Sequence, residues 1–251
     1  MEVSVLASGS SGNCTLIKTK ESKFLVDVGL SCKQTVKKLA SKGYDLDEIN
    51  AIFITHEHID HIRGLNTIAR KFDTPVFMNS ATYESSFFSK SVNLFDGMPF
   101  SIEDIQVTPI NVNHDAANTV GFVLENNRKL GIFTDLGTVS DEMRQLMPDF
   151  DAIVLESNHD IDMLINGPYP YHLKQRILSD KGHLSNIDAG LFIRDCAGEK
   201  LRNVFLAHLS RNNNTAELAY NTFQSLISQN KELCARPIIT NQFESTELIK
   251  I

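Results

Sequence analysis

The feature that most constrains this chain is a short run of metal-binding side chains directly after an apolar segment. Residues 51–55 read AIFIT, which predicts a buried strand, and the next six residues read HEHIDH. His56, His58 and Asp60 alternate, so in an extended turn their side chains can point the same way. Imidazole is the commonest metal ligand in proteins, and carboxylate supplies hard oxygen. The segment therefore predicts a metal site at a strand end, since a merely solvated polar loop seldom carries these ligand types at this spacing.

Composition places the chain among globular proteins. Of its 251 residues 42% are apolar and 22% are charged, and no linker or repeat divides them, so we expect one domain over residues 1–251. The net charge of −7 argues against a simple nucleic-acid-binding module, which is usually basic. It does not argue against an enzyme that acts on nucleic acid, because bound cations would reverse the local potential.

The sequence also predicts where the protein works. No apolar run approaches the ~18–20 residues that cross a bilayer. The opening segment MEVSVLASGS predicts a strand rather than a signal peptide. The four cysteines form no CxxC pair and are expected to be reduced thiols that bind no metal. We therefore expect a cytoplasmic protein that does not bind membranes.

Apolar runs and helical patterns alternate along most of the chain. We expect strands at residues 2–7, 14–18, 23–29, 51–55, 75–78, 105–112, 119–125, 129–134, 151–157, 203–208 and 237–240. We expect helices at residues 31–43, 62–72, 140–147, 171–179, 185–198 and 215–230. Strands that are apolar on both faces predict two sheets packed face to face with helices outside, which is an α/β fold.

Three further candidate ligands come at the ends of apolar runs. These are His114, Asp135 and His208. Each is weak alone, because a single histidine or aspartate at a strand end is more often structural. All three, however, follow an apolar run that predicts a strand, and functional sites are usually built from loops at strand ends.

These residues carry a resemblance to a known family. HEHIDH resembles the HxHxDH motif of the metallo-β-lactamase fold superfamily, and His114, Asp135 and His208 occur in the order of its later motifs. The resemblance implies a four-layer αββα sandwich of two mixed sheets with outer helices. Within the superfamily, SGSSGNC and residues 169–186 and 207–219 are similar to the WalJ/YycJ group. That group implies a 5′→3′ exonuclease acting on double-stranded DNA, with repair proteins as partners.

The resemblance also assigns roles to the candidate ligands. It divides them between two divalent ions: His56, His58 and His114 for one, Asp60, His61 and His208 for the other, and Asp135 bridging the two. Asp60 is also a catalytic candidate, and Asp27 would brace the histidine turn. A hydroxide between the ions would be the nucleophile, because coordination lowers the pKa of water from ~15.7 towards ~7. The nitrogen and oxygen ligands suit Zn²⁺, Mn²⁺ or Fe²⁺.

Differences between this sequence and other branches of the superfamily reduce the number of functions to consider. Asp135 stands where antibiotic-hydrolysing β-lactamases have a cysteine. Only 72 residues separate Asp135 from His208, too few for the inserted domain of the β-CASP nucleases. The chain also lacks a glycine-rich arm resembling the one with which tRNA 3′-processing enzymes bind tRNA. The sequence therefore favours a compact hydrolase.

Cleaving a phosphodiester also requires a proton for the leaving oxygen. His183 lies in GHLSN, before a helix that Ser185 could cap. In the related tRNA-processing nucleases a histidine in a similar element is the acid and pairs with a glutamate, which corresponds here to Glu156. The resemblance therefore makes both residues catalytic candidates. A surface histidine beside a helix cap is the alternative for His183.

Several polar side chains are candidates for binding substrate phosphates. They are Lys174, Arg176, Arg211, Asn213, Asn214 and His159, the last also as an aid to the second metal. A solvated helix face explains the lysine and Arg176 about as well, and a helix cap ending at Thr215 explains the asparagines. His159 could equally be an ordinary loop residue.

Two other functions stay open on the sequence alone. The same pair of ions could hydrolyse a small substrate such as a cyclic phosphodiester, a lactone or a thioester. The chain could also be a non-catalytic metal-binding module. The large ligand set argues against the second of these, because structural zinc sites are normally closed by four ligands.

Overall fold

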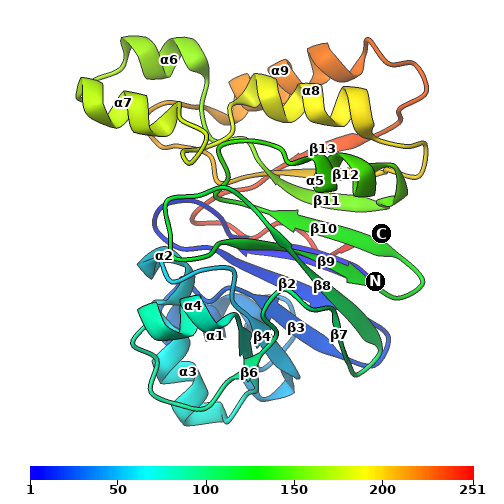
Figure 1. Cartoon of the computed structure of the whole chain (residues 1–251). Helices are drawn as coiled ribbons and strands as arrows, with labels where there is room; N and C mark the ends of the chain where they lie inside the picture. Colours follow the sequence, from blue (N-terminus) through cyan, green and yellow to red (C-terminus); the bar gives the residue numbers. More distant parts are fainter.

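The computed structural model describes all 251 residues and contains two seven-stranded sheets packed face to face (Figure 1). The first sheet is ordered β14 (Ile249–Lys250), β1 (Glu2–Ala7), β2 (Cys14–Lys18), β3 (Lys23–Val26), β4 (Ala51–Phe53), β5 (Val76–Met78) and β6 (Asn93–Leu94). The second is ordered β13 (Arg236–Ile239), β12 (Asn203–Ala207), β11 (Ala152–Glu156), β10 (Lys129–Phe133), β9 (Val120–Glu125), β8 (Ile105–Asn111) and β7 (Phe100–Ile102). Both sheets are mixed, since parallel and antiparallel pairs occur in each.

Helices cover both outer faces (Figure 1). On the side of the first sheet lie α1 (Cys32–Ala40), α2 (Ile59–Ile62), α3 (Leu65–Phe72) and α4 (Ser80–Ser85). On the side of the second lie α5 (Asp141–Leu146), α6 (Ile161–Asn166), α7 (Tyr171–Ile177), α8 (Asn186–Cys196) and α9 (Ala216–Ile227). Two short 3₁₀ helices span Leu46–Glu48 and Met147–Asp149. Not one of these helices combines the length and the apolar character needed to cross a membrane.

The core explains why so many strands are apolar throughout. Phe24 and Phe53 of the first sheet point inward and meet Phe122 of the second, with 5.9 Å between the ring centroids of Phe53 and Phe122. Their neighbours Leu25 and Ile52 point outward and pack beneath α1 and α3. The second sheet alternates in the same way, so both faces of each sheet are buried. The predicted αββα sandwich is confirmed.

Some local predictions differ from the structure. The helix expected at 62–72 begins later, as α3 at Leu65, and a separate short helix, α2, precedes it. Between the two the Gly64 amide donates to the Val28 carbonyl (2.8 Å) and the chain turns. The six-residue helices α4 and α6 and the short strands β6, β7 and β14 were not predicted. Segments this short hold too few residues for an apolar period to be read.

Strand direction determines where the site can form. β10, β11 and β12 are parallel, so their carboxyl ends lie at one edge of the sandwich and their amino ends at the other. β3 and β4 of the first sheet are also parallel to each other. The loops that carry the candidate ligands follow β4, β8, β10 and β12.

Candidate metal centre

The histidine turn is held by Asp27, the residue directly after β3. Its carboxylate accepts hydrogen bonds from the Thr55 amide (2.9 Å) and the Thr55 hydroxyl (2.9 Å). Its Oδ2 also lies 2.7 Å from His61 Nδ1, which donates to it. This bond leaves His61 Nε2 free to face the site, the usual arrangement around a histidine that binds metal. Asp27 thus has the contacts expected of a residue that braces the turn.

The loop after β1 packs against the other side of the turn. The Asn13 amide donates to the Asp60 carbonyl (2.8 Å), and the Asn13 side-chain nitrogen lies 2.9 Å from His61 Nε2. Gly29 allows this close approach, because a Cβ there would collide with the backbone of Asp60. The backbone around Asp60 is therefore fixed from two directions.

Three residues of the site have left-handed backbones. Asp27, Asp135 and His208 have φ angles of 59°, 57° and 56°. Such angles are uncommon for residues other than glycine, and at constrained sites they cost about 1–3 kcal/mol each. Asp27 and His208 come directly after strands and Asp135 two residues after one, where the unusual backbone turns the side chain towards the common centre.

Seven side chains converge from four loops. Ligand atoms of His56, His58 and His114 lie within 4.8 Å of one another, and those of Asp60, His61 and His208 do the same. These are the two sets that the sequence resemblance implied, and we call them the three-histidine triad and the mixed triad.

Asp135 lies between the triads. Its Oδ2 is 2.8 Å from His61 Nε2, and its Oδ1 is 3.7 Å from His114 Nε2 and 3.4 Å from His208 Nδ1. It also forms a cluster of its own with His56 and His61. One buried carboxylate is therefore within reach of both triads, which is the position that a bridging ligand needs.

Glu156, the last residue of β11, organises the remaining side of the site. Its Oε1 accepts hydrogen bonds from His183 Nδ1 (2.9 Å) and His208 Nδ1 (2.7 Å). Its Oε2 accepts from the backbone amides of Leu136 (2.9 Å) and Leu184 (3.3 Å). This fully buried carboxylate thus connects the loops after β10 and β12 with the loop that carries His183.

His183 differs from the other histidines around Glu156. Its side chain is 23% exposed, against 4% for His208. The helix after it begins where expected, because the Ser185 hydroxyl accepts from the Asp188 amide and caps α8. The cap fixes the loop, and the bond to Glu156 leaves Nε2 of His183 available on the exposed side.

The two triads have different electrostatics. Burial lowers the pKa values of His56 and His114, so both imidazoles are neutral at neutral pH. Burial alone would also lower the pKa of His61, but the carboxylates of Asp27 and Asp135 raise it to about 10. Burial would raise the pKa of Glu156, but His183 and His208 lower it to about 2. His56 and His114 therefore offer neutral ligands, whereas the mixed triad combines the Asp60 carboxylate with imidazoles whose pKa values are raised, those of His61 and His208.

The donor set fits divalent metal ions. His56 Nε2 and His208 Nε2 are buried without a hydrogen-bond partner. Buried polar atoms without partners are costly, and such atoms are rare unless an ion or a ligand satisfies them. Imidazole and carboxylate donors in clusters this tight are suited to Zn²⁺, Mn²⁺ or Fe²⁺.

The candidate phosphate-binding residues are placed in different surroundings. Arg176 forms an exposed ion pair with Asp115 (3.0 Å), next to the ligand His114. Lys174 donates to the Ile165 carbonyl (2.6 Å) within the lobe of α6 and α7, which projects at the upper left of Figure 1. Arg211 is exposed and lies over the ring of Phe243, with 5.2 Å from Cζ to the ring centroid. Of these three residues, Arg176 and Arg211 have exposed guanidinium groups close to a loop that carries a metal ligand.

Three of the other candidates are interior residues. His159, Asn213 and Asn214 are buried, and His159 belongs to none of the metal clusters. The Asn214 side-chain nitrogen donates to the carbonyls of Ser157 (2.9 Å) and Asn158 (3.0 Å). These positions argue against the predicted contacts with substrate or the second metal, because the side chains connect loops from within. Asparagine is common in such bracing roles, and the sequence does not distinguish the two uses.

Sequence reasoning missed Ser8, Asn13 and Thr55. The Ser8 hydroxyl accepts from the His208 amide (2.7 Å), and the Thr55 hydroxyl lies 3.0 Å from His56 Nδ1. Asn13 contacts His61 as described above. Thr55 adjoins the histidine turn and could have been suspected, but Ser8 and Asn13 reach the site only through the fold.

Comparisons with known proteins agree with this geometry. The Beta-lactamase superfamily domain profile matches residues 22–208. Exodeoxyribonuclease YycJ of Bacillus anthracis is 42% identical over 232 residues, which cover 87% of this chain and 86% of that protein. Exodeoxyribonuclease WalJ of Streptococcus pneumoniae is 37% identical over 236 residues, covering 90% and 88%.

Solved structures show the same fold at lower identity. The metallo-β-lactamase fold protein YhfI from Bacillus subtilis superposes with a TM-score of 0.73 at 16% identity, over 98% of each chain. The short form of human tRNase Z superposes with a TM-score of 0.67 at 17% identity, over 100% of each chain. At such identities the likeness concerns the fold alone.

Proposed function

We propose that this chain, a metal-dependent hydrolase, is a 5′→3′ exonuclease on double-stranded DNA. It belongs to the β-lactamase superfamily domain family, in the group of YycJ and WalJ. The observation that carries the proposal is the convergence of two triads on one carboxylate, beside a partly exposed histidine. The exodeoxyribonuclease names of its relatives support DNA as the polymer. A cytoplasmic location is part of the proposal and fits the four free thiols.

We assign two divalent ions, Zn²⁺, Mn²⁺ or Fe²⁺, to the site. His56, His58 and His114 would hold one, Asp60, His61 and His208 the other, with Asp135 shared between them. When bound, such a pair neutralises phosphate charge and makes water acidic enough to supply a nucleophile near neutral pH. Asp27 and Glu156 each accept a hydrogen bond from the Nδ1 of a ligand histidine, so they fix the tautomer and direct Nε2 into the site.

His183 supplies the proton for the leaving oxygen in this proposal. Glu156 accepts its Nδ1 hydrogen and so favours the form in which Nε2 can carry and donate a proton. The partial exposure of His183 allows contact with a phosphodiester, whereas His208, the other histidine bonded to Glu156, is buried. Glu156 itself is a positioning residue, since it is buried and reaches the reaction only through the two imidazoles.

The direct test is digestion of duplex DNA labelled at one end. With Mn²⁺ or Zn²⁺ added, the protein should release label at once from a 5′-phosphorylated end and only late from a 3′ end. The His58→Ala variant should be inactive, because it loses one member of the three-histidine triad. The Lys71→Ala variant serves as the control, since Lys71 is exposed on α3.

The outcome separates the candidate functions. Hydrolysis of bis(p-nitrophenyl) phosphate without any release from DNA would remove the exonuclease and keep the hydrolase. Early release from the 3′ end would reverse the proposed polarity. RNA of the same sequence tests the choice of polymer.

A further inference from the structure

The segment that follows β13 lies beside the metal centre, although the sequence gives it no motif. The Ser8 amide donates to the Asn241 carbonyl (3.1 Å), while the Ser8 hydroxyl accepts from the amide of the ligand His208 (2.7 Å). One residue therefore joins a metal ligand to the start of this segment. A hollow of about 200 Å³ opens here, lined by Ser8, Ser210, Arg211, Gln242 and Phe243 and by the first residues of α9.

Gln242 is a buried polar side chain on the wall of this hollow. It is 8% exposed, and neither its Oε1 nor its Nε2 has a hydrogen-bond partner in the protein. The loop after β1 closes tightly on it at Gly9, whose φ of 132° no other residue would adopt easily and where a Cβ would collide with the Gln242 amide. An unpartnered buried amide costs free energy unless a ligand satisfies it. Its position in a hollow that Ser8 connects to the ligand His208 indicates a binding site.

Phe243 and Arg211 form the outer rim of the hollow. The Phe243 side chain is 66% exposed, and the Arg211 guanidinium lies over its ring. Arg211 follows the ligand His208 by three residues, so their Cα atoms are at most about 11 Å apart. An exposed aromatic ring with an adjacent cation is the arrangement on which nucleic-acid bases stack while their phosphates are neutralised.

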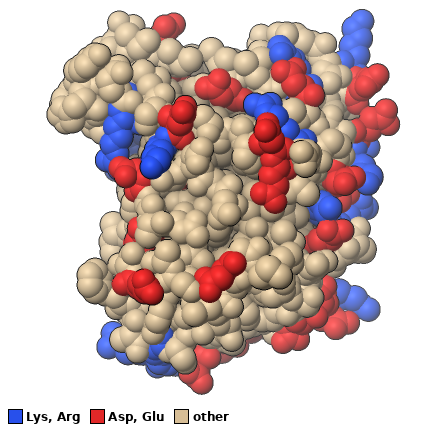
Figure 2. Space-filling view, in the orientation of Figure 1, with Lys and Arg blue, Asp and Glu red and all other residues tan.

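Lysines of α1 continue the cationic surface on the other side of Phe243. A second hollow between the ring and α1 is lined by Lys37, Lys38 and Lys42, with Glu244 as its acidic residue. Lys38 donates to the Phe243 carbonyl (2.9 Å), which fixes the segment to the helix. Elsewhere, on the face drawn in Figure 2, Lys and Arg are interspersed with Asp and Glu. Although the chain as a whole is acidic, the surface around Phe243 is therefore locally positive.

From this juxtaposition we propose that Phe243, Arg211 and Gln242 form a binding site for the unpaired end of a nucleic-acid strand next to the metal centre. A base stacks on Phe243 over the hollow whose wall includes Gln242, while Arg211, Lys37 and Lys42 neutralise phosphates. The inference rests on the proposed nuclease function and specifies where one strand is held. It extends that function to residues that lie outside the metal motif.

Binding can be measured apart from cleavage. The probe is a fluorescent, 5′-phosphorylated oligothymidylate with phosphorothioate linkages, which resists hydrolysis, and the protein is loaded with Mn²⁺. Fluorescence anisotropy should show about tenfold weaker binding for Phe243→Ala, the size typical of one stacked base. Phe243→Tyr should bind as the parent does, because it keeps the ring. Arg211→Ala should lower the slope of log K against log salt by about 0.7, and Arg211→Lys should restore it.

The chain offers a matched control in Phe87, which is 91% exposed and lies outside both hollows. Phe87→Ala should bind as the parent does, and thermal melting of each variant checks that it is folded. Equal binding by Phe243→Ala and Phe87→Ala would overturn the inference, as would a parent that does not bind the probe. Digestion of end-labelled duplex DNA by the parent tests the nuclease proposal separately, because it measures cleavage and not the binding of the resistant probe.

Discussion

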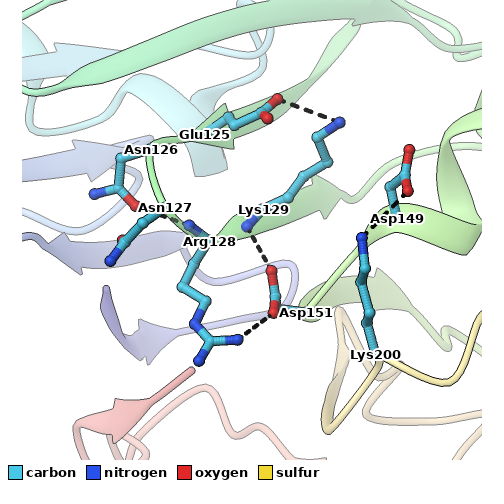
Figure 3. A pocket seen from close by; sticks show the side chains of 8 residues that line it. All are labelled: Glu125, Asn126, Asn127, Arg128, Lys129, Asp149, Asp151 and Lys200. Carbon is cyan, nitrogen blue, oxygen red and sulfur yellow. Dashed lines mark hydrogen bonds and ion pairs between the residues drawn. The ribbon is translucent and has the colours of Figure 1, made fainter.

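At the amino ends of β10, β11 and β12 the charged side chains pair with one another, whereas at the carboxyl ends of the same strands a buried ligand atom, His208 Nε2, has no hydrogen-bond partner. The amino ends form a hollow of about 230 Å³, the far hollow (Figure 3), lined by Glu125, Asn126, Asn127, Arg128, Lys129, Asp149, Asp151 and Lys200. Its ion pairs join Arg128 to Asp151 (2.7 Å), Lys129 to Glu125 (3.2 Å) and Lys200 to Asp149 (3.5 Å).

The difference between the two ends concerns burial as much as pairing. Arg128 is 51% exposed, while His61 and Asp135 have 0% and 3% of their side chains exposed. Exposed ion pairs contribute about 0–1 kcal/mol each, so the far hollow needs no ligand to be stable. Buried atoms without a hydrogen-bond partner, such as His56 Nε2 and His208 Nε2, need an outside partner. Buried polar atoms without partners, rather than the size of a hollow or its charge, mark the functional end of these strands.

The largest effect should come from His183→Ala. Cleavage of DNA should fall by about 10²- to 10⁴-fold, because the leaving oxygen loses its proton donor. Bis(p-nitrophenyl) phosphate, whose leaving group needs no proton, should be cleaved by the variant much more nearly at the rate of the parent. Steady-state kinetics on both substrates provide the measurement. Equal losses on both would mean that His183 supports the site in another way.

Asp27→Asn should have the next largest effect. The amide cannot accept from His61 Nδ1 and from Thr55 as the carboxylate does, so His61 is no longer held in one tautomer. Affinity for one metal ion should fall by about 10- to 100-fold, the range found for residues that orient metal ligands. Competition with a chelating dye measures the affinity, and unchanged binding would contradict the role of Asp27.

The two triads should bind ions with different dependence on pH. In the metal-free protein the raised pKa of His61 keeps a proton on it below about pH 10, and an ion must displace that proton. Affinity at the mixed triad should thus rise by about tenfold per pH unit for each proton displaced, between neutral pH and about 10. Burial keeps His56 and His114 neutral, so they have no proton to lose.

Titration calorimetry in buffers with different ionisation enthalpies counts the protons released. His58→Ala leaves the mixed triad intact, and His208→Ala leaves the three-histidine triad intact. The first variant should release more protons per ion than the second. The same release from both would show that the triads do not differ in this way.

The smallest effect should be found at the far hollow. Arg128→Ala removes an exposed ion pair with Asp151, so the free energy of unfolding should fall by no more than about 1 kcal/mol. DNA cleavage and metal content should be unchanged. Urea denaturation and the end-label assay test this, and a loss of activity would remove the contrast between the two ends.

The metal site was more predictable than its surroundings, for a physical reason. His56, His58, Asp60 and His61 are adjacent in sequence, so their spacing alone limits where the side chains can go. Ser8 and Asn13 reach the site only after β1 and β2 have paired, and serine and asparagine serve many structural purposes. Sequence could not indicate this use.

The same limit affected the fold and the substrate residues. The strands could be predicted from their apolar runs because both faces of each sheet are buried. The short helices α4 and α6 have side-chain caps but are too short to show a periodic apolar pattern. Asn214 was expected at the substrate because it follows a ligand loop, yet that loop folds inward and its amide bonds to Ser157 and Asn158. Proximity in sequence to a metal ligand therefore did not predict whether the side chain points towards the substrate or into the protein.

We propose that two neighbouring triads each hold an ion around Asp135. Metal content per chain, measured by mass spectrometry after dialysis against Mn²⁺ or Zn²⁺, tests it most directly. We expect about two ions in the parent and about one in each of His58→Ala and His208→Ala. A parent that binds no ion, or a single ion that persists in both variants, would contradict it.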